Sequence, residues 1–342
     1  MIHLLILLLS AWLLAADMPA HEANAVGLSF LSVSVAERHG IMDITLWYPA
    51  TKGGTPVLIG DSPLFKGEIA RQDAPKAAGS HPLILLSHGG LKSGPFIGAW
   101  MASRLASKGF VVAMMRQPDP HTMTSEESIR EIWLRPADLS AALTAIERDD
   151  TLSGGIDRNR IGVLGFLVGG TSALSIAGGD IDPESFARSC DPGGTGIDCV
   201  EFATAGIDLH SVDRQKLSRS HLDPRVKTAV VIDPEFGASF TPESLAQISI
   251  PVRLINLGTP KTVWPGLRAS DLKSAISGAR YDLIMNASQY SAFSECKPAG
   301  ASILREEGEE PLCQDPEGTN RAAIHDSLAE MVAAAFHSDL PQ

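Results

Sequence analysis

The chain has 342 residues, of which 44% are hydrophobic and 20% are charged, and its formal net charge is −12. This composition is typical of a globular protein, and one α/β domain accommodates this length. The composition argues against a nucleic-acid partner, because phosphate binding requires clustered Lys and Arg and the sequence contains no basic run.

Residues 1–25 predict a secretory signal peptide. A short apolar core over residues 4–16 is followed by small residues, with candidate cleavage sites after Ala16, Ala20 and Ala25. The core is too short to span a membrane comfortably. We therefore expect a periplasmic or secreted protein with no membrane span after signal cleavage. An N-terminal anchor that stays attached is the alternative, because the segment before the apolar core lacks Lys and Arg.

The N-terminal half of the remaining chain predicts strands and one short helix, separated by turn signals. Gly89 follows a buried apolar strand as a turn residue, and Gly109 is suited to end a helix as its C-terminal cap. The predicted elements are a hairpin of strands over residues 26–35 and 41–48, a strand within "HPLILLSHGG" (81–90), a helix over 100–108 and the strand "FVVAMM" (110–115).

The C-terminal half continues the alternation of helices and apolar strands. Its predicted elements are an amphipathic helix over 136–148, a strand over 161–164, the strands "VKTAVVID" (226–233), "PVRLINLG" (251–258) and "RYDLIMN" (280–286), and a helix over 321–336. Continuous apolar strands alternating with helices predict an α/β fold with a mostly parallel sheet covered on both faces. Residues 178–222 lack clear periodicity and predict an insertion over the carboxyl ends of the strands, where ligands bind in such sheets.

The four cysteines all lie in the C-terminal half. An even number in an exported chain indicates disulfides, and each local pair flanks a loop-like stretch. We predict the pairs Cys190–Cys199 and Cys296–Cys313, with four free thiols or a metal site as alternatives. The sequence predicts no metal site and no cofactor, because it has neither CxxC spacing nor a nearby His pair.

One motif bears directly on whether the protein is an enzyme. In "IGVLGFLVGG" (161–170) an apolar strand enters a turn framed by Gly165 and Gly169, and a helix of small residues follows. This is the layout of the nucleophile elbow G-x-S-x-G, in which the middle residue is the attacking serine. The middle residue here is Leu167, and no other G-x-S-x-G occurs in the chain. The two glycines are therefore interpreted as backbone requirements of the turn and of close helix–strand packing.

Several segments in a consistent order resemble one superfamily. They are "LWYPA" (46–50), "LLSHGG" (85–90), "LASKGFVVAMM" (105–115), "IDRNRIGVLGFLVGG" (156–170) and "DPRVKTAVVIDP" (223–234). Together they resemble the α/β-hydrolases, and within them the secreted group related to dienelactone hydrolases and platelet-activating-factor acetylhydrolases. The resemblance covers most of the mature chain. It implies one α/β-hydrolase domain over residues 26–342 and a triad in the chain order Ser, Asp, His.

The resemblance also locates the triad positions, and each carries a residue unsuited to its role. The serine position falls on Leu167, which has no nucleophilic atom. The acid position, in "GTPKTVWP", falls on Lys261, and its neighbours Pro260 and Thr262 are not acidic either. The histidine position, in "NASQYSAF", falls on Gln289. Glutamine does not act as a general base near neutral pH.

The backbone of an oxyanion hole is expected to survive these replacements. Its donors would be the N–H of Val168 and a group from the loop at Gly89 and Gly90. His325 and His337 lie on or beyond the terminal helix, and we interpret both as exposed or capping residues.

Other polar residues are candidates for replacement machinery. They are Ser87, His88, His121, Asp233 and Ser291. His88 is interpreted as a structural residue of the oxyanion loop, and Asp233 as a turn residue before Pro234.

Two functions remain open from the sequence. One is a pseudoenzyme that binds an apolar ligand with an anionic end, paired with Lys261 unless that lysine is simply exposed, or that acts as partner or regulator of an active relative. The other is an ester or lactone hydrolase with a relocated nucleophile.

Overall fold

The structure is a computed structural model that describes residues 25–91, 93–119 and 122–341. The predicted signal peptide lies outside these residues, apart from Ala25, which begins the first strand. His121 also lies outside them. Within the described part of the chain, no helix is both long and apolar enough to cross a membrane.

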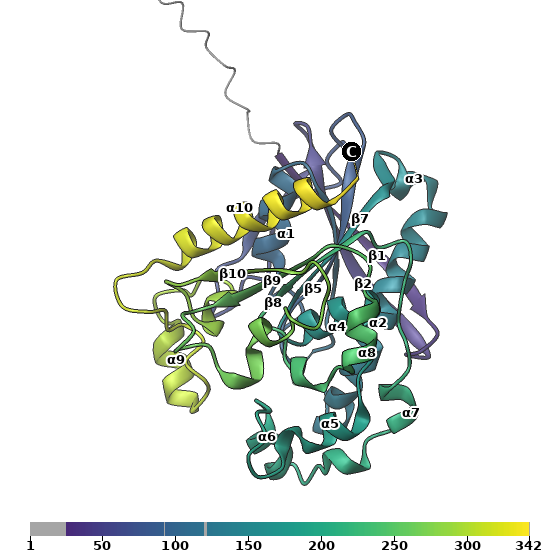
Figure 1. Cartoon of the computed structure of the whole chain (residues 1–342). Helices are drawn as coiled ribbons and strands as arrows, with labels where there is room; N and C mark the ends of the chain where they lie inside the picture. The colour runs from purple at the N-terminus through teal and green to yellow at the C-terminus, as the bar shows by residue number, and fades with distance from the viewer. Residues whose placement is uncertain (1–24, 92, 120–121, 342) are drawn as a thin grey trace, which may run out of the picture.

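A mixed sheet of ten strands runs through the molecule in the order β10-β9-β8-β7-β5-β6-β2-β1-β4-β3 (Figure 1). All neighbours from β10 to β6 are parallel, so the predicted mostly parallel sheet is confirmed. The strands are β1 (Ala25–Val35), β2 (Gly40–Ala50), β3 (Thr55–Ile59), β4 (Glu68–Gln72), β5 (His81–Ser87), β6 (Val111–Met115), β7 (Ile156–Phe166), β8 (Thr228–Ile232), β9 (Val252–Leu257) and β10 (Arg280–Ile284).

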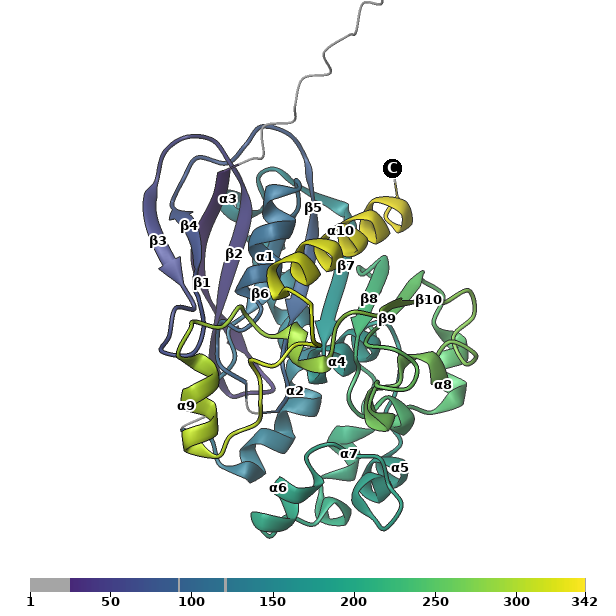
Figure 2. The ribbon, with the colours of Figure 1, turned by 90° about the vertical axis from the view of Figure 1, so that its left-hand side faces the viewer.

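The N-terminal strands form the predicted hairpin. β1 and β2 are antiparallel, with Ala25 opposite Ala50 and Val35 opposite Gly40. β3 and β4, which the sequence pattern does not predict, extend the sheet beyond β1 (Figure 2). Their short and partly polar sequences become strands through pairing with each other and with β1.

Helices cover both faces of the central strands. Val163 of β7 packs in one core cluster with Leu174 of α4, while the next residue, Leu164, packs in the opposite cluster with Leu328 of α10. Burial on both faces explains why these strands are continuously apolar rather than alternating. The helices outside the insertion are α1 (Ala99–Ser107), α2 (Ser125–Arg148), α3 (Asp150–Ser153), α4 (Val168–Ile176), α8 (Pro242–Gln247), α9 (Gly300–Glu307) and α10 (Arg321–Asp339).

The α2 helix corrects a predicted boundary. We predicted an amphipathic helix that begins at Pro136. It begins at Ser125, where Thr124 and Glu127 form a reciprocal capping box, and Pro136 lies inside it. Tertiary burial of residues such as Ile132 stabilises the first half of the helix, despite the hydrogen bond that a proline removes.

Residues 178–222 contain three short helices that lie together beyond one end of the sheet, near α2 and α4 (Figures 1 and 2). These helices are α5 (Pro183–Ala187), α6 (Cys199–Thr204) and α7 (Arg214–Leu217). Both predicted disulfides are confirmed: Cys190–Cys199 closes a loop within this segment, and Cys296–Cys313 closes a loop around α9.

Candidate functional site

The turn between β7 and α4 has the backbone of a nucleophile elbow. Leu167 adopts φ 56° and ψ −123°, in the positive-φ region that costs a branched side chain about 1–3 kcal/mol. A Cβ on Gly165 would lie 1.9 Å from the carbonyl oxygen of Gly169, and a Cβ on Gly169 would lie 2.0 Å from that of Ser87. Only glycine fits at these two positions, because α4 and β5 approach the turn so closely.

Apolar side chains fill the space around the apex of this turn. Leu167 is 6% exposed and clusters with Val263 and Leu267, and Ile197 and Phe293 pack against that cluster. Ile197 comes from the disulfide-closed loop of residues 190–199. Side chains from three separate segments therefore surround the apex.

The disulfide-closed loop rests directly on the segment after β9. A Cβ on Gly266 would lie 2.1 Å from the carbonyl oxygen of Thr195, so the two backbones touch at this point. Ile197 reaches the Leu167 cluster from the same loop. Part of the 178–222 segment thus covers the carboxyl end of β7.

Lys261, at the expected acid position, is exposed. It lies in a turn in which the N–H groups of Thr262 and Val263 both donate to the carbonyl oxygen of Thr259. The turn directs Val263, rather than a charged side chain, into the cluster with Leu167. This exposure favours the interpretation of Lys261 as a surface lysine.

Gln289, at the expected histidine position, is half-buried and opens a 3₁₀ turn, Gln289–Ala292. The core anchors this turn through its carbonyl groups. Trp100 Nε1 donates to the carbonyl oxygen of Ala292 at 2.9 Å, and His88 Nε2 lies 2.9 Å from the same oxygen. The segment that carries Gln289 is therefore held in a fixed conformation.

His325 corrects a prediction, because it is neither exposed nor a cap. It is fully buried, its ring stacks on Trp100 with centroids 3.6 Å apart, and its Nε2 lies 2.9 Å from the carbonyl oxygen of Ser291. Burial lowers the pKa of His325 to about 3, so the ring is neutral. His337 is exposed, and its Nδ1 lies 2.8 Å from the carbonyl oxygen of Ala333.

Ser87 and His88 lie in the core rather than at an open site. Ser87 is 0% exposed and His88 2% exposed. The His88 ring stacks on Phe166 with centroids 4.3 Å apart, and burial lowers its pKa to about 3. A histidine of this kind does not accept a proton near neutral pH, which agrees with a structural role.

Asp233 and Ser291 are engaged in separate structural contacts. Asp233 Oδ1 accepts hydrogen bonds from Asn256 Nδ2 at 2.6 Å and from the N–H of Leu257 at 3.0 Å. Ser291 Oγ donates to Asp315 at 2.7 Å. Burial raises the pKa of Asp233 to about 7. The described replacement candidates therefore form no common constellation.

The loop of the expected oxyanion hole is held by an arginine that sequence reasoning missed. Arg135 is buried in α2 and donates to the carbonyl oxygens of Gly89 at 2.9 Å and Gly90 at 2.7 Å. Its charge is paired with Glu131 at 3.2 Å. Val168 is the first residue of α4, where backbone N–H groups have no partner within the helix. A buried Glu–Arg pair four residues apart is the signal that could have indicated this arrangement.

Glu235 is the second residue missed. Its N–H donates to the carbonyl oxygen of Leu167 at 3.2 Å, and its side chain is 4% exposed. A Cβ on Gly90 would lie 3.3 Å from Glu235 Oε1. Burial, and then the charges of Asp198 and Glu310, raise the pKa of Glu235 well above its usual range. A buried carboxyl group, rather than an ammonium group, therefore lies beside the elbow.

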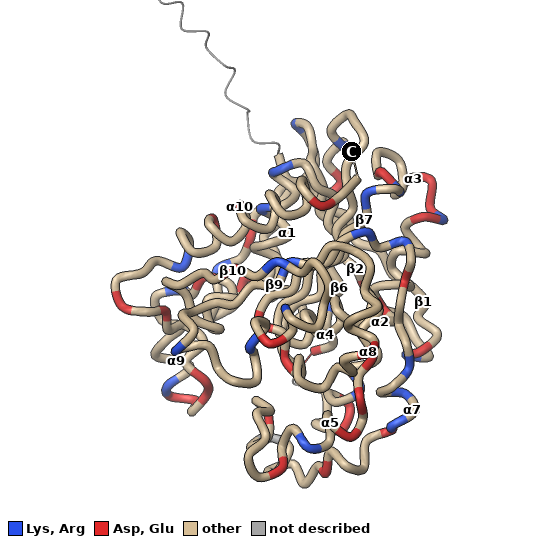
Figure 3. Tube along the Cα trace, viewed as in Figure 1, with Lys and Arg blue, Asp and Glu red and all other residues tan. Residues whose placement is uncertain are grey.

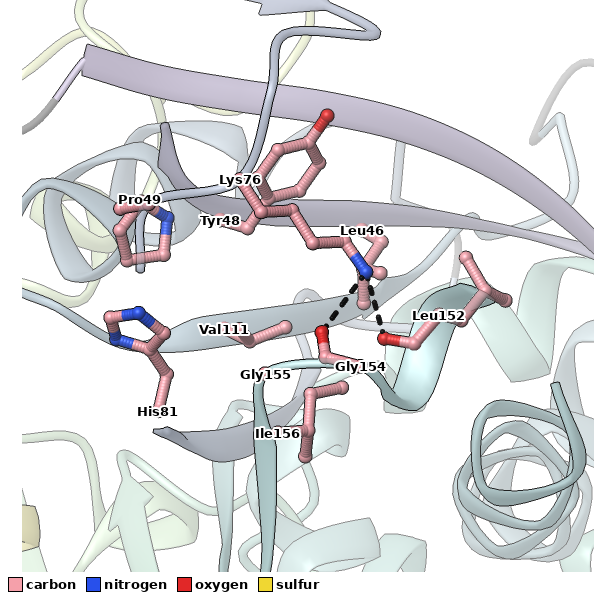
Figure 4. Close-up of a pocket in the computed structure, with 11 residues that line it drawn as sticks. Leu46, Tyr48, Pro49, Lys76, His81, Val111, Leu152, Gly154, Gly155 and Ile156 are labelled. Atoms are coloured by element: carbon pink, nitrogen blue, oxygen red, sulfur yellow. Dashed lines mark hydrogen bonds between the residues drawn. The ribbon is translucent and has the colours of Figure 1, made fainter. Parts of the chain in front are cut away.

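A small cavity at the opposite end of the sheet offers no alternative site. It has a volume of about 10 Å³ and is lined by residues around the start of β7, including Ile156 (Figure 4). The polar groups at this cavity are already paired, because Lys76 Nζ donates to the carbonyl oxygens of Leu152 and Gly154. Such a volume holds at most about one water molecule. Among the described residues, no group of three His, Cys, Asp or Glu side chains is arranged to hold a metal ion.

Comparison with known proteins identifies the fold. No protein-family model and no curated protein matches the sequence. Among solved structures, the chain is similar to a ferulic acid esterase from Streptomyces cinnamoneus, with 17% identity and a TM-score of 0.59 over 95% of this chain and 92% of that one. It is also similar to a dienelactone hydrolase from Anabaena variabilis, with 14% identity and a TM-score of 0.48 over 92% of this chain and 98% of that one. The chain thus has an α/β-hydrolase fold.

Proposed function

We propose that the mature chain, one domain over residues 26–342, is an exported α/β-hydrolase-fold protein that acts by binding and not by serine hydrolysis. The observation that carries this proposal is the packing of Leu167 with Val263 and Leu267, under Ile197. In a serine hydrolase the elbow presents a nucleophile to an acyl group. Here the same backbone presents a buried methyl group to other apolar side chains.

The chemistry of the replacements supports the proposal. Hydrolysis by a triad needs a nucleophile, a base that takes its proton and a carboxylate that orients the base. Leu167, Gln289 and Lys261 supply none of these functions. Loss of a complete triad removes about a million-fold of rate, and the remnant over water is only ~1,000- to 10,000-fold.

The partner of such a protein is either a small ligand or another protein, such as an active relative. A ligand with an anionic end is disfavoured at the central site, because Lys261 is exposed and the polar group beside Leu167 is the carboxyl of Glu235. Export is supported by the two disulfides, which are typical of proteins outside a reducing cytosol. Cleavage of residues 1–25 would release the chain, and retention of that segment would anchor it.

Labelling with a fluorophosphonate probe tests the proposal. The purified mature protein is treated with the probe, and adducts are located by peptide mass spectrometry, with an active serine esterase as positive control. We expect no labelling that depends on the native fold. In other words, no serine should react with the probe in the native protein and fail to react after heat denaturation. Such an adduct would identify a relocated nucleophile and establish the alternative, an ester or lactone hydrolase.

A further inference from the structure

The insertion contains a cavity that the central site does not account for. It has a volume of about 140 Å³ and lies between the Cys190–Cys199 disulfide, α6 and the 3₁₀ turn Leu209–Ser211. This volume is close to that of an engineered cavity of about 150 Å³ that binds benzene. The cavity therefore has room for one ring-sized group.

The inner wall of the cavity is apolar and well packed. Ala187, Phe202 and Leu209 line it and are 2%, 2% and 5% exposed. The Cys190–Cys199 disulfide forms another part of the wall. Because a covalent bond and buried side chains hold these groups in place, the cavity is preformed, and a ligand entering it loses little affinity to reorganisation.

The mouth of the cavity is acidic. Asp191, Asp208 and His210 line it, and His210 Nε2 lies 3.1 Å from Asp191 Oδ1, with both side chains about half exposed. Asp208 accepts a hydrogen bond from the N–H of His210 at 2.9 Å. The two aspartates outnumber the one titratable cation that lines the cavity, His210, whose pKa is raised by its hydrogen bond to Asp191.

Neighbouring charges do not reverse this balance. Arg188 and Arg214 do not line the cavity, and both pair with the carboxylate of Glu184, each at 3.1 Å. Along the trace, acidic residues in α5 lie close to the basic residues of α7 (Figure 3). The titratable side chains that line the cavity itself are therefore Asp191, Asp208 and His210.

We propose that this cavity binds a small organic cation, with a ring-sized apolar group against Phe202 and Leu209 and an ammonium group against Asp191. Burial of the ring removes apolar surface from water, and the ammonium replaces His210 as the partner of Asp191. A neutral ring compound also buries its ring but cannot form the ion pair with Asp191. The site is separate from the elbow, so this proposal stands whether or not the chain hydrolyses esters.

The test uses the mature protein with both disulfides intact and benzylammonium as the probe, followed by NMR titration. We expect saturable binding with a Kd on the order of 1 mM, which is reasonable for a ligand of this size. Benzyl alcohol, which has the same ring and no charge, is expected to bind about threefold more weakly or worse. Absence of saturation up to about 10 mM benzylammonium overturns the proposal.

Two substitutions locate the binding. Asp191→Asn is expected to weaken benzylammonium binding about threefold and to leave benzyl alcohol unchanged. Ala203→Leu adds volume at the cavity wall and is expected to weaken both compounds about tenfold or more, whereas Ala205→Leu, on the same segment but outside the lining, leaves both unchanged. Equal binding of the two compounds, or no effect of Ala203→Leu, overturns the assignment. Thermal melts confirm that each variant is folded.

Discussion

Leu167 and Val263 belong to one buried apolar cluster, although they lie almost one hundred residues apart in the chain. Leu167 stands at the apex of the turn after β7, and Val263 lies in the turn after β9. Apolar packing joins these two turns. The predictions below follow from this packing and from the polar groups around it.

Introducing a serine at position 167 alone is expected to leave the protein inactive. In Leu167→Ser we expect no base among the described residues to take the proton of the new hydroxyl. Gln289 occupies the expected position, and burial lowers the pKa of His88 and His325 to about 3, so both are too weakly basic. The variant also loses apolar packing, at a cost of about 2–5 kcal/mol in unfolding free energy. Hydrolysis of p-nitrophenyl acetate is measured against Leu167→Ala, which has the same cavity and no hydroxyl. Activity in the serine variant alone would mean that a base lies within reach.

Removing the disulfide of the insertion is expected to loosen the cover of the elbow. The double substitution of Cys190 and Cys199 by serine frees the loop that carries Ile197, and it destabilises the protein by about 3 kcal/mol through loop-closure entropy. Hydrogen exchange is expected to accelerate in residues 191–198 and at the start of α4.

The second disulfide supplies the control for that experiment. Replacing Cys296 and Cys313 by serine frees a loop around α9 and costs a similar free energy. We expect no acceleration of exchange at the start of α4 in this variant. Equal acceleration in both variants would show that hydrogen exchange at the start of α4 reports global stability and not the packing of the 190–199 loop over Leu167.

Asp233 is expected to make stability decrease as pH rises. Its pKa is raised by burial from 3.8 to about 7, so between these values the folded state keeps a proton that the unfolded state releases. The loss reaches at most roughly 4 kcal/mol above the upper value. Asp233→Asn keeps the acceptor oxygen for Asn256 and Leu257 and removes the titration. Urea unfolding at pH 5 and pH 8 should therefore show a smaller decrease for the variant, and an unchanged decrease would refute this assignment.

Arg135 is expected to be the most sensitive charged residue of the site region. Arg135→Met leaves the carbonyls of Gly89 and Gly90 without this donor, at a cost of about 1–3 kcal/mol for each unsatisfied group. It also removes one of the two arginines that pair with Glu131, whose other partner, Arg38, stays at 2.7 Å. Arg135→Lys should recover only part of this, because an ammonium cannot reproduce the planar fork. Urea unfolding measures both variants. Arg116→Met, which removes an exposed pair with Asp43, serves as control and should cost less than about 1 kcal/mol.

The sequence by itself determined the features that depend on local pattern or on covalent spacing. Continuous apolar strands predicted the parallel sheet, because burial on both faces leaves no room for alternation. The glycines at 165 and 169 predicted the elbow, since no side chain fits between the turn, α4 and β5. The cysteine spacing predicted both disulfides, because short loops bring neighbouring thiols together.

Only the tertiary structure decided which distant side chains meet. The burial of His325 against Trp100, the reach of Arg135 to Gly89 and the place of Glu235 beside Leu167 all join segments far apart in the chain. In α2 a local capping box marks the start of the helix, but burial against other elements stabilises its first half despite Pro136. The type of a residue determines which bonds its side chain can form. Burial and the partners supplied by other elements determine the charge, the exposure and the role of that side chain.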